Sequence, residues 1–377
     1  MKKIAAFIFT LVLSLAIIAV AAYAEENAIT DELDIDMRPV SDSLPDDVKG
    51  KLEENNITAD SVDEITSITA ADVFAYVWDE VKHKASYPVR VFAMMLCVIT
   101  VNAAVNGFSD CLSNKSLERI YNMVTVLIIT SVISEPVSEC VALTAETLRS
   151  GAEFMICYIP VFSGIAASSG SITSAAAYNT ALMLISEAVV WISAEYVMPV
   201  LSVCMSLGII EAINPSFQLT SVTEGISKLV RIALGFVMII FIGVLSLQSI
   251  IGTSADTLGI KAAKYLASNF IPVVGGAVAD AYTTIRSSLG ILRGGTGFFG
   301  IATLFFMTVP VIVEIGIMKL VFDCSDMICS MFGFGNIKII IKNTSSILAM
   351  MLSLMICFTM MLIISTALLM SMGMNMY

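Results

Sequence analysis

Residues 344–371, TSSILAMMLSLMICFTMMLIISTALLMS, decide the fold class, because no charged side chain interrupts this long apolar stretch. A helix of about 20 apolar residues is long enough to cross the hydrocarbon core of a membrane. Six more apolar runs of comparable length lie at 88–107, 118–136, 172–193, 195–213, 229–251 and 296–320. Together these runs predict an all-α, polytopic membrane protein with seven transmembrane helices.

The overall composition agrees with this prediction. Hydrophobic residues make up 57% of the chain and charged residues 14%, whereas soluble domains are about half apolar and about a quarter charged. These values exclude an ordinary soluble enzyme. Nucleic acid is also excluded as a partner, because the sequence has no basic stripe that could neutralise phosphates.

The first 24 residues are typical of a secretory signal peptide. Lys2 and Lys3 form a basic start, the run 4–20 is apolar, and Ala22-Tyr23-Ala24 supplies the small residues of a cleavage site. We therefore predict a cleavable signal peptide over 1–24. A retained first transmembrane helix is the alternative.

Residues 25–87 are strongly acidic. The stretch 25–84 contains 17 acidic and five basic residues, an excess that equals the net charge of the whole chain, −12. Acidic and apolar residues are interleaved here, which predicts a partly helical, exported segment on the outer face of the membrane. Solvation is the simplest reason for its acidity. The remainder, 88–377, is then the polytopic membrane domain.

One apolar piece, 152–170, is short and contains Pro160, Gly164 and Gly170. A broken backbone at membrane depth must be shielded by protein or line a cavity, so we predict a re-entrant segment. The positive-inside rule favours the same interpretation. With this piece re-entrant, four basic residues fall on the cytoplasmic side: Lys261, Lys264, Arg286 and Arg293.

A short sequence match indicates an internal repeat. YIPVFSG at 158–164 resembles FIPVVGG at 270–276, and Leu117–Ile120 matches Leu229–Ile232 at the same offset of 112 residues. Three predicted spans separate the two units, so the second would be inverted, as in many transporters. Coincidence among common apolar residues is the alternative. The candidate broken-helix or pathway positions are Pro160, Gly164, Pro272, Gly275 and Gly276.

Two acidic residues lie inside predicted spans, Glu187 and Glu314. An intramembrane acid is costly, so it is expected to face a cavity or another helix. Each is therefore either a polar position on a pathway or a hydrogen-bonded contact between helices. No Lys or Arg lies in the middle of a predicted span, so the sequence predicts no charged partner for them.

The sequence gives little support for a catalytic, metal-binding or nucleotide-binding site. The single histidine, His83, cannot complete a metal site or a Ser–His hydrolase constellation, and no Walker A motif is present. Gly295–Gly300 matches the glycine spacing of dinucleotide-binding loops, but no strand precedes it, so we expect no dinucleotide site there. Its small residues favour close helix packing instead. We expect no catalytic residue, no metal and no cofactor.

Residues 256–300 resemble the stage III sporulation protein AE family of endospore-forming bacteria. The residues that carry the resemblance are Asp256, KAAKY at 261–265, FIPVVGGAVADA at 270–281, a basic, glycine-containing turn at Leu292-Arg293-Gly294, and a following span with Pro310. The chain departs from the family pattern at Val313 and Glu314, where the family tends to carry Lys, and in having no Pro after Val311. These departures put Glu314 and the 321–343 loop in doubt as carriers of a shared function.

The resemblance implies a sporulation role in the mother-cell membrane around the forespore. There, the family acts with other stage III proteins in a secretion-like channel complex, and it has no catalytic residues to carry over. The resemblance thus implies a permease-like membrane subunit of a hetero-oligomeric complex, in contact with membrane lipid. A structural platform for complex assembly and a stand-alone secondary transporter are the alternatives.

Overall fold

The computed structural model describes most of the chain. The described residues are 38–54, 57, 70–109, 115–192, 195, 197–213, 219–270 and 275–371. The predicted signal peptide, 1–24, lies outside them, as does Pro272. Among the described residues all regular structure is helical, which confirms the all-α prediction.

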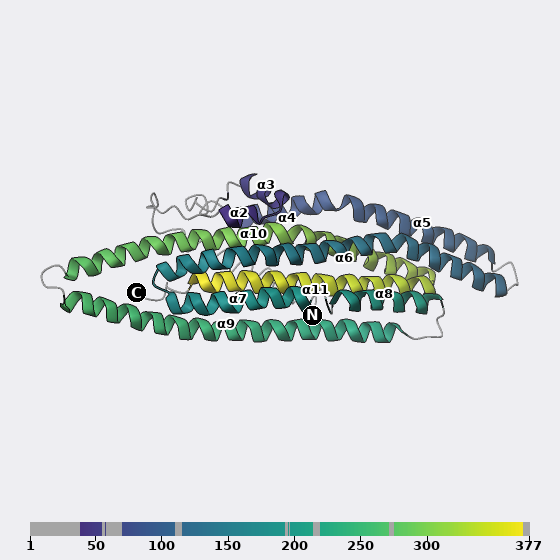
Figure 1. Cartoon of the computed structure of the whole chain (residues 1–377). Helices are drawn as coiled ribbons and strands as arrows, with labels where there is room; N and C mark the ends of the chain where they lie inside the picture. The colour runs from purple at the N-terminus through teal and green to yellow at the C-terminus, as the bar shows by residue number, and fades with distance from the viewer. Residues whose placement is uncertain are drawn as a thin grey trace.

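Three short helices precede the long ones: α2 (Arg38–Asp42), α3 (Asp46–Glu54) and α4 (Ala70–Lys84). The remaining helices are α5 (Ser86–Ser109), α6 (Lys115–Ser168), α7 (Ile172–Ile192), α8 (Met198–Ile213), α9 (Thr220–Phe270), α10 (Gly275–Phe332) and α11 (Gly335–Ser371). The long helices run along the same axis and form an elongated bundle, with α2–α4 over the middle of α10 (Figure 1).

Three of these helices are far longer than a membrane is thick. α6, α9 and α10 have 54, 51 and 58 residues, which correspond to about 75–90 Å of helix. The hydrocarbon core measures about 30 Å. A bilayer can therefore cover only part of each long helix.

Five helices in the described part of the chain, rather than the predicted seven, are long and apolar enough to cross a membrane. Their apolar stretches are Ser86–Val105, Met123–Ser168, Ser221–Ala262, Leu292–Phe332 and Gly335–Met370. The predicted span 195–213 falls on α8, whose 16 residues extend only about 24 Å. Figure 1 shows α7 and α8 following one another along the bundle instead of forming a hairpin.

The second difference concerns α6, because this one continuous helix contains the predicted span 118–136 and all but the last two residues of the predicted re-entrant piece 152–170. No loop separates the two pieces. The buried side chains of Val137, Cys140 and Leu148 continue the core-facing stripe through this region, while Glu139 and Glu146 lie on the exposed face. An amphipathic pattern of this kind keeps the stretch helical and packed, even though Pro136 lies within it.

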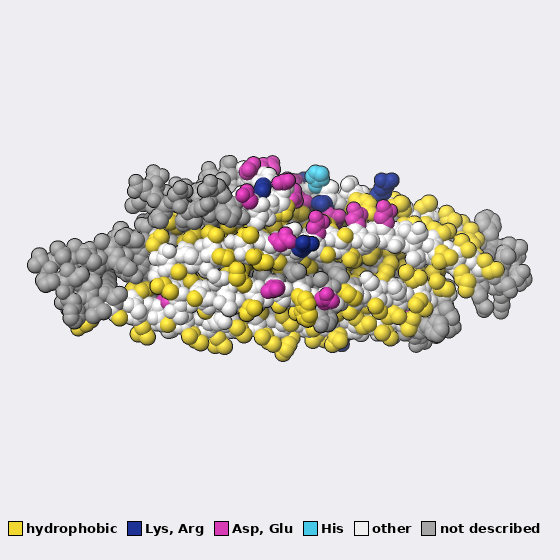
Figure 2. Space-filling view, viewed as in Figure 1, with side chains coloured by type: hydrophobic (Ala, Val, Ile, Leu, Met, Phe, Trp, Pro, Cys, Tyr) yellow, Lys and Arg dark blue, Asp and Glu magenta, His cyan; other side chains and the backbone are white. Residues whose placement is uncertain are grey.

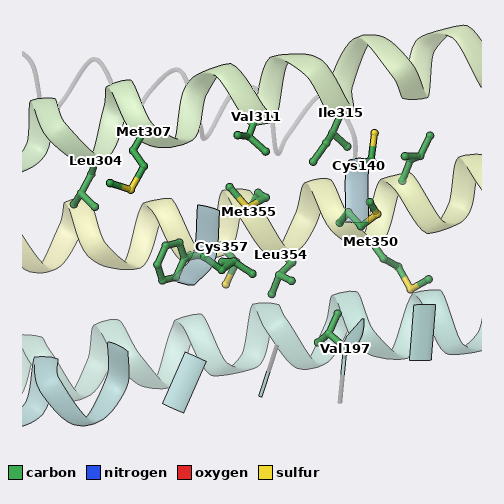
Figure 3. Close-up of a cluster of buried hydrophobic side chains, with 14 of the residues drawn as sticks. Cys140, Val197, Leu304, Met307, Val311, Ile315, Met350, Leu354, Met355 and Cys357 are labelled. Atoms are coloured by element: carbon green, nitrogen blue, oxygen red, sulfur yellow. The ribbon is translucent and has the colours of Figure 1, made fainter. Parts of the chain in front are cut away.

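The core of the bundle surrounds α11. In its most apolar window 72% of α11 is buried, against 11% for α9. Figure 3 shows the central packing, in which side chains of α10 meet those of α11. The labelled residues are Cys140, Val197, Leu304, Met307, Val311, Ile315, Met350, Leu354, Met355 and Cys357. Methionine fills irregular gaps well, which suits a core built from such long helices.

Candidate functional site

Glu314, one of the two predicted intramembrane acids, has a charged partner. Its Oε2 lies 2.9 Å from Lys84 Nζ, at the end of α4. The expectation that no cation within the chain would pair with Glu314 is therefore wrong. Lys84 belongs to the acidic N-terminal segment and lies outside every predicted span, so only the tertiary structure could bring the two together.

Aromatic packing reinforces this contact between α4 and α10. The ring of Tyr76 lies 4.9 Å from that of Phe306 and 5.7 Å from that of Phe305, measured between centroids. Lys51 of α3 donates a 3.0 Å hydrogen bond to Tyr76 Oη and lies 3.6 Å from Glu80. Burial, followed by the charge of Glu80, raises the pKa of Tyr76 above its ordinary value, so the hydroxyl stays neutral. The acidic segment is thus docked onto the bundle.

Charged side chains gather around this docked segment. The space-filling view shows Asp and Glu gathered near α2–α4 and along the middle of this face, with hydrophobic side chains over much of the rest (Figure 2). On α6 the exposed acids of this region are Glu135, Glu139, Glu146 and Glu153. Exposed charges are costly in lipid, which argues against placing the middle of this face in the hydrocarbon layer.

A second polar site lies at the turn between α6 and α7. Gly170 has a φ of 90°, and two backbone bonds close the end of α6: Gly170 N–H to Ala167 O at 3.0 Å, and Ser171 N–H to Ala166 O at 3.1 Å. This is a Schellman cap, which needs glycine at the left-handed position. Of the three residues predicted to break segment 152–170, only Gly170 ends the helix.

Asp256 of α9 caps the start of α7 at this turn. Its carboxylate accepts hydrogen bonds from Thr173 N–H at 2.8 Å, Ser174 N–H at 3.0 Å and the Ser174 hydroxyl at 2.6 Å. The first backbone N–H groups of a helix have no partner within it, and a carboxylate there also interacts favourably with the helix dipole. α9 approaches closely at this point, because a Cβ on Gly252 would lie 2.6 Å from Ser174 Oγ.

Arg293 of α10 also contacts the α6–α7 turn. Only 3% of this residue is exposed. Its Nη1 donates to Ser171 Oγ at 3.2 Å, and its Nη2 donates to the carbonyl of Leu369 in the last turn of α11. A cation near a helix C-terminus is stabilising. The predicted turn at 292–294 is wrong, because Arg293 lies inside the continuous helix α10.

A glycine face lets α10 approach α6 next to this site. A Cβ on Gly300 would lie 2.4 Å from the ring of Tyr158, and one on Gly297 would lie 3.2 Å from Phe162. Tyr158 donates a 3.0 Å hydrogen bond to Thr296 O, and its ring stacks on Phe154. This contact agrees with the interpretation of the Gly295–Gly300 pattern as close helix packing.

The remaining predicted positions do not converge on one site. Pro160 and Gly164 are exposed within α6, and a Cβ on Gly164 would meet nothing within 4 Å. Glu187 is exposed on α7. Gly275 and Gly276 open α10. Pro272 lies in the connection outside the described residues.

The two units of the predicted repeat also differ in structure. Residues 158–164 lie inside α6, whereas 270–276 begin at the end of α9 and finish at the start of α10. Likewise, Leu117–Ile120 lies at the start of α6, but Leu229–Ile232 lies inside α9. An inverted structural repeat is therefore not shown.

Sequence reasoning missed the structural roles of Asp256 and Arg293. Both lie just outside the predicted spans 229–251 and 296–320, so neither was counted as an intramembrane charge. The sequence feature that could have indicated these roles is the position of both residues in the stretch 256–300, which resembles the family and lies close to long apolar runs. Among the described residues no group of three His, Cys, Asp or Glu side chains is placed to hold a metal ion.

Comparison with known proteins identifies the family. The family model described as Stage III sporulation protein AE (spore_III_AE) matches residues 51–373. The chain belongs to this family. The stage III sporulation protein AE match covers α4 to α11 and the C-terminal end of α3 from residue 51. Both the Lys84–Glu314 pair and the Asp256–Arg293 site thus lie within the family region.

A curated relative supports the assignment. Stage III sporulation protein AE of Bacillus subtilis (strain 168) is 25% identical over 232 residues, which represent 62% of this chain and 57% of the relative. The alignment thus spans little more than half the length of that relative. No solved structure matches the chain.

Proposed function

We propose that this protein is a non-catalytic, permease-like membrane subunit of a channel complex that links the mother cell and the forespore during sporulation. The family match over 51–373 supports the sporulation role, and the five long apolar helices support the membrane location. The proposed location is the mother-cell membrane around the forespore. The proposed partners are other stage III sporulation proteins in a hetero-oligomeric complex.

The proposed orientation places residues 25–87 on the outer face, after removal of the signal peptide 1–24. Docking of α4 onto α10 through Lys84 and Glu314 then sets the level of the outer surface along the bundle. The part of α10 near Glu314 would lie at this surface, since α3 and α4 carry many charged side chains.

The observation that best supports a pathway role is the anchoring of the two helices that flank Pro272. Asp256 on α9 binds Ser174 in the first turn of α7, and Arg293 on α10 binds Ser171 in the turn just before it. Beyond these anchors the two helices continue as a hairpin past the ends of α6, α7 and α11 (Figure 1). We propose that this hairpin, with Pro272, Gly275 and Gly276 at its tip, contacts the pathway or the partner subunits that form it.

A structural platform is the second candidate function. The observation that favours it is the docked N-terminal segment, which presents α3 and α4 on the side of the bundle (Figure 1). In this role the protein would hold partners in place and would contribute nothing to the pathway itself.

Substitutions at the hairpin tip distinguish these functions. Pro272→Ala and Gly275→Leu would be introduced in the source organism, with Gly235→Leu as a control at an exposed helical glycine of α9. The pathway role predicts blocked sporulation while partner proteins still co-purify in normal amounts. Loss of co-purification would support the platform instead. Uptake of a solute into liposomes by the purified protein alone would support a stand-alone transporter and contradict both.

A further inference from the structure

The hairpin of α6 and α7 carries no charged side chain over the part nearest its turn. The turn is at Gly170, and Asn179 Nδ2 of α7 donates to Ser163 Oγ of α6 at 3.2 Å. Counted from the turn, the first charged residue is Glu153 on α6 and Glu187 on α7, and both are exposed. Each lies about 25 Å from the turn along its helix. The two acids therefore mark one level of the bundle.

A charged side chain on α9 sets the other limit of this uncharged region. α7 and α9 run in opposite directions (Figure 1), and a Cβ on Gly252 of α9 would lie 2.6 Å from Ser174 Oγ of α7. From this contact, the exposed Lys261 lies about 14 Å further along α9, and Glu187 lies about 20 Å away in the other direction. The two levels are thus about 33 Å apart. The hydrocarbon core of a bilayer measures about 30 Å.

The charges between these two levels are shielded by protein. On α6, α7, α9, α10 and α11 they are Asp256 and Arg293, which are 7% and 3% exposed. Both bind at the α6–α7 turn. Charges at membrane depth are expected to face the interior of the bundle in this way. The surface at these levels instead exposes large apolar side chains, which include Ile156, Leu184, Leu247 and Ile250.

Both tryptophans of the chain lie near the border that the two acids mark. Trp191 of α7 is one turn beyond Glu187 and is 55% exposed. Trp78 of α4 is 54% exposed, and Tyr76 on the same helix packs its ring against that of Phe305. Phe305 lies level with the acid of α6, because both are about 8 Å from the glycine contact between α6 and α10 described above. Trp and Tyr are enriched where a membrane meets water.

The opposite half of the bundle has no comparable region. Lys342 of α11 pairs with Glu224 of α9 at 2.6 Å, and each side chain is 49% exposed. The next turn of α11 binds Asp323 of α10, close to the point where α10 meets Met95 of α5. Lipid around the middle of α5 would therefore contain an exposed ion pair. Beyond this level α5 continues for only about 20 Å, which is too short to cross a bilayer.

We propose that the hydrocarbon layer surrounds the bundle between the level of Glu153 and Glu187 and the level of Lys261. α6, α7, α9, α10 and α11 cross it, whereas α5 and α8 stand outside the lipid with the charged half of the bundle. Five crossings place the end of α11 on the opposite side from α2–α4. The position of the lipid does not depend on the proposed function. Its sidedness does, and with that orientation Lys261 faces the cytoplasm, as the positive-inside rule expects.

Thiol labelling tests the position of the lipid. Single cysteines are introduced into the full chain, with its eight native cysteines replaced by alanine, in a host that makes no sporulation proteins. Ile250→Cys and Val101→Cys are a matched pair, because the native side chains are 65% and 55% exposed. A water-soluble maleimide needs the thiolate, which lipid disfavours, so Ile250→Cys should react at least about tenfold more slowly. Equal labelling in native membranes, or protection of Val101→Cys, would overturn the proposal.

Two further cysteines test the sidedness separately. Lys228 and Lys261 are both exposed on α9, at opposite sides of the proposed lipid layer. Lys228→Cys should react in intact cells, and Lys261→Cys only after the membrane is permeabilised. The reverse pattern would contradict the orientation given under the proposed function but would still support the position of the lipid. Labelling of both variants in intact cells would overturn that position.

Fluorescence quenching decides the matter if the cysteine-free chain does not fold. The wild type is placed in liposomes whose acyl chains carry bromine either near the headgroup or near the chain end. Trp78 and Trp191 should be quenched more by bromine near the headgroup. Ile250→Trp, in a chain with Trp78→Phe and Trp191→Phe, should be quenched more by bromine near the chain end. Val101→Trp in the same background should be quenched by neither, and strong quenching of it would contradict the proposal.

Discussion

Lys84 Nζ lies 2.9 Å from Glu314 Oε2, and this pair fastens the last turn of α4 to the middle of α10. The side chain of Glu314 is 13% exposed and that of Lys84 39% exposed. The pair is therefore partly shielded from water, and its loss would leave an acid against an apolar helix. Through this contact, α4 of the acidic N-terminal segment packs against the bundle.

Reversing the charge of Lys84 should loosen α4. Lys84→Glu places two acids together, and a pair of this exposure contributes about 1 kcal/mol. Hydrogen exchange of the α4 backbone should therefore accelerate about fivefold. Lys82→Glu is the matched control, because the described partners of Lys82 are Asp79 and the ring of Trp78, both on its own helix. The double variant Lys84→Glu/Glu314→Lys should regain protection; equal exchange in all variants would show that the pair does not hold α4.

Removing the carboxylate of Asp256 should destabilise the start of α7. Asp256→Ala leaves two backbone N–H groups and the Ser174 hydroxyl without their acceptor. Loss of such a cap costs about 2 kcal/mol. The expected result is a lower thermal unfolding midpoint and faster exchange at 172–176. Ser254→Ala is the control, since its hydroxyl bonds only to Ile250 O on the exposed side of α9. An unchanged midpoint in Asp256→Ala would contradict the capping role.

Replacing Arg293 by lysine should weaken its contacts at the α6–α7 turn and with the end of α11. A lysine has no planar fork and is poorly suited to reach both Ser171 Oγ and Leu369 O in the geometry that arginine uses. Losing one buried, charged hydrogen bond costs about 1.5–3 kcal/mol. Backbone amides in the last turn of α11 should then exchange more than tenfold faster. Arg149→Lys, at an exposed pair with Glu153, should have little effect; a comparable change in both variants would argue against a specific role for Arg293.

Adding a methyl group at Gly300 should force α6 and α10 apart. The new Cβ would lie 2.4 Å from the ring of Tyr158, and overpacking of this kind costs about 1–3 kcal/mol. Gly300→Ala should therefore lower the free energy of unfolding. Gly164→Ala is expected to do the opposite, by up to about 1 kcal/mol, because alanine favours the helix and the space is open. If the clash is the cause, Tyr158→Val should rescue Gly300→Ala in a double-mutant cycle.

The candidate site was only partly predictable from the sequence. Glu314 was singled out as an acid inside a predicted span, but its charged partner Lys84 lies 230 positions earlier in the chain. Asp256 and Arg293 were visible as members of a family-like stretch, yet their capping roles depend on the α6–α7 turn, which a linear reading cannot place beside them. Pro160 and Gly164 were expected to break a helix that in fact continues to Ser168.

Three properties could be predicted without a structure: the helical membrane class, the acidity of the N-terminal segment and the family resemblance, which the comparisons confirmed. These properties follow from local composition, because the preference of each residue for lipid or water adds up along the chain. The packed bundle was needed to show that α6 is continuous, that Lys84 pairs with Glu314, and that Asp256 and Arg293 meet at one turn. Ion pairs and caps act over a few ångströms, so they depend on which distant segments the packed core brings together.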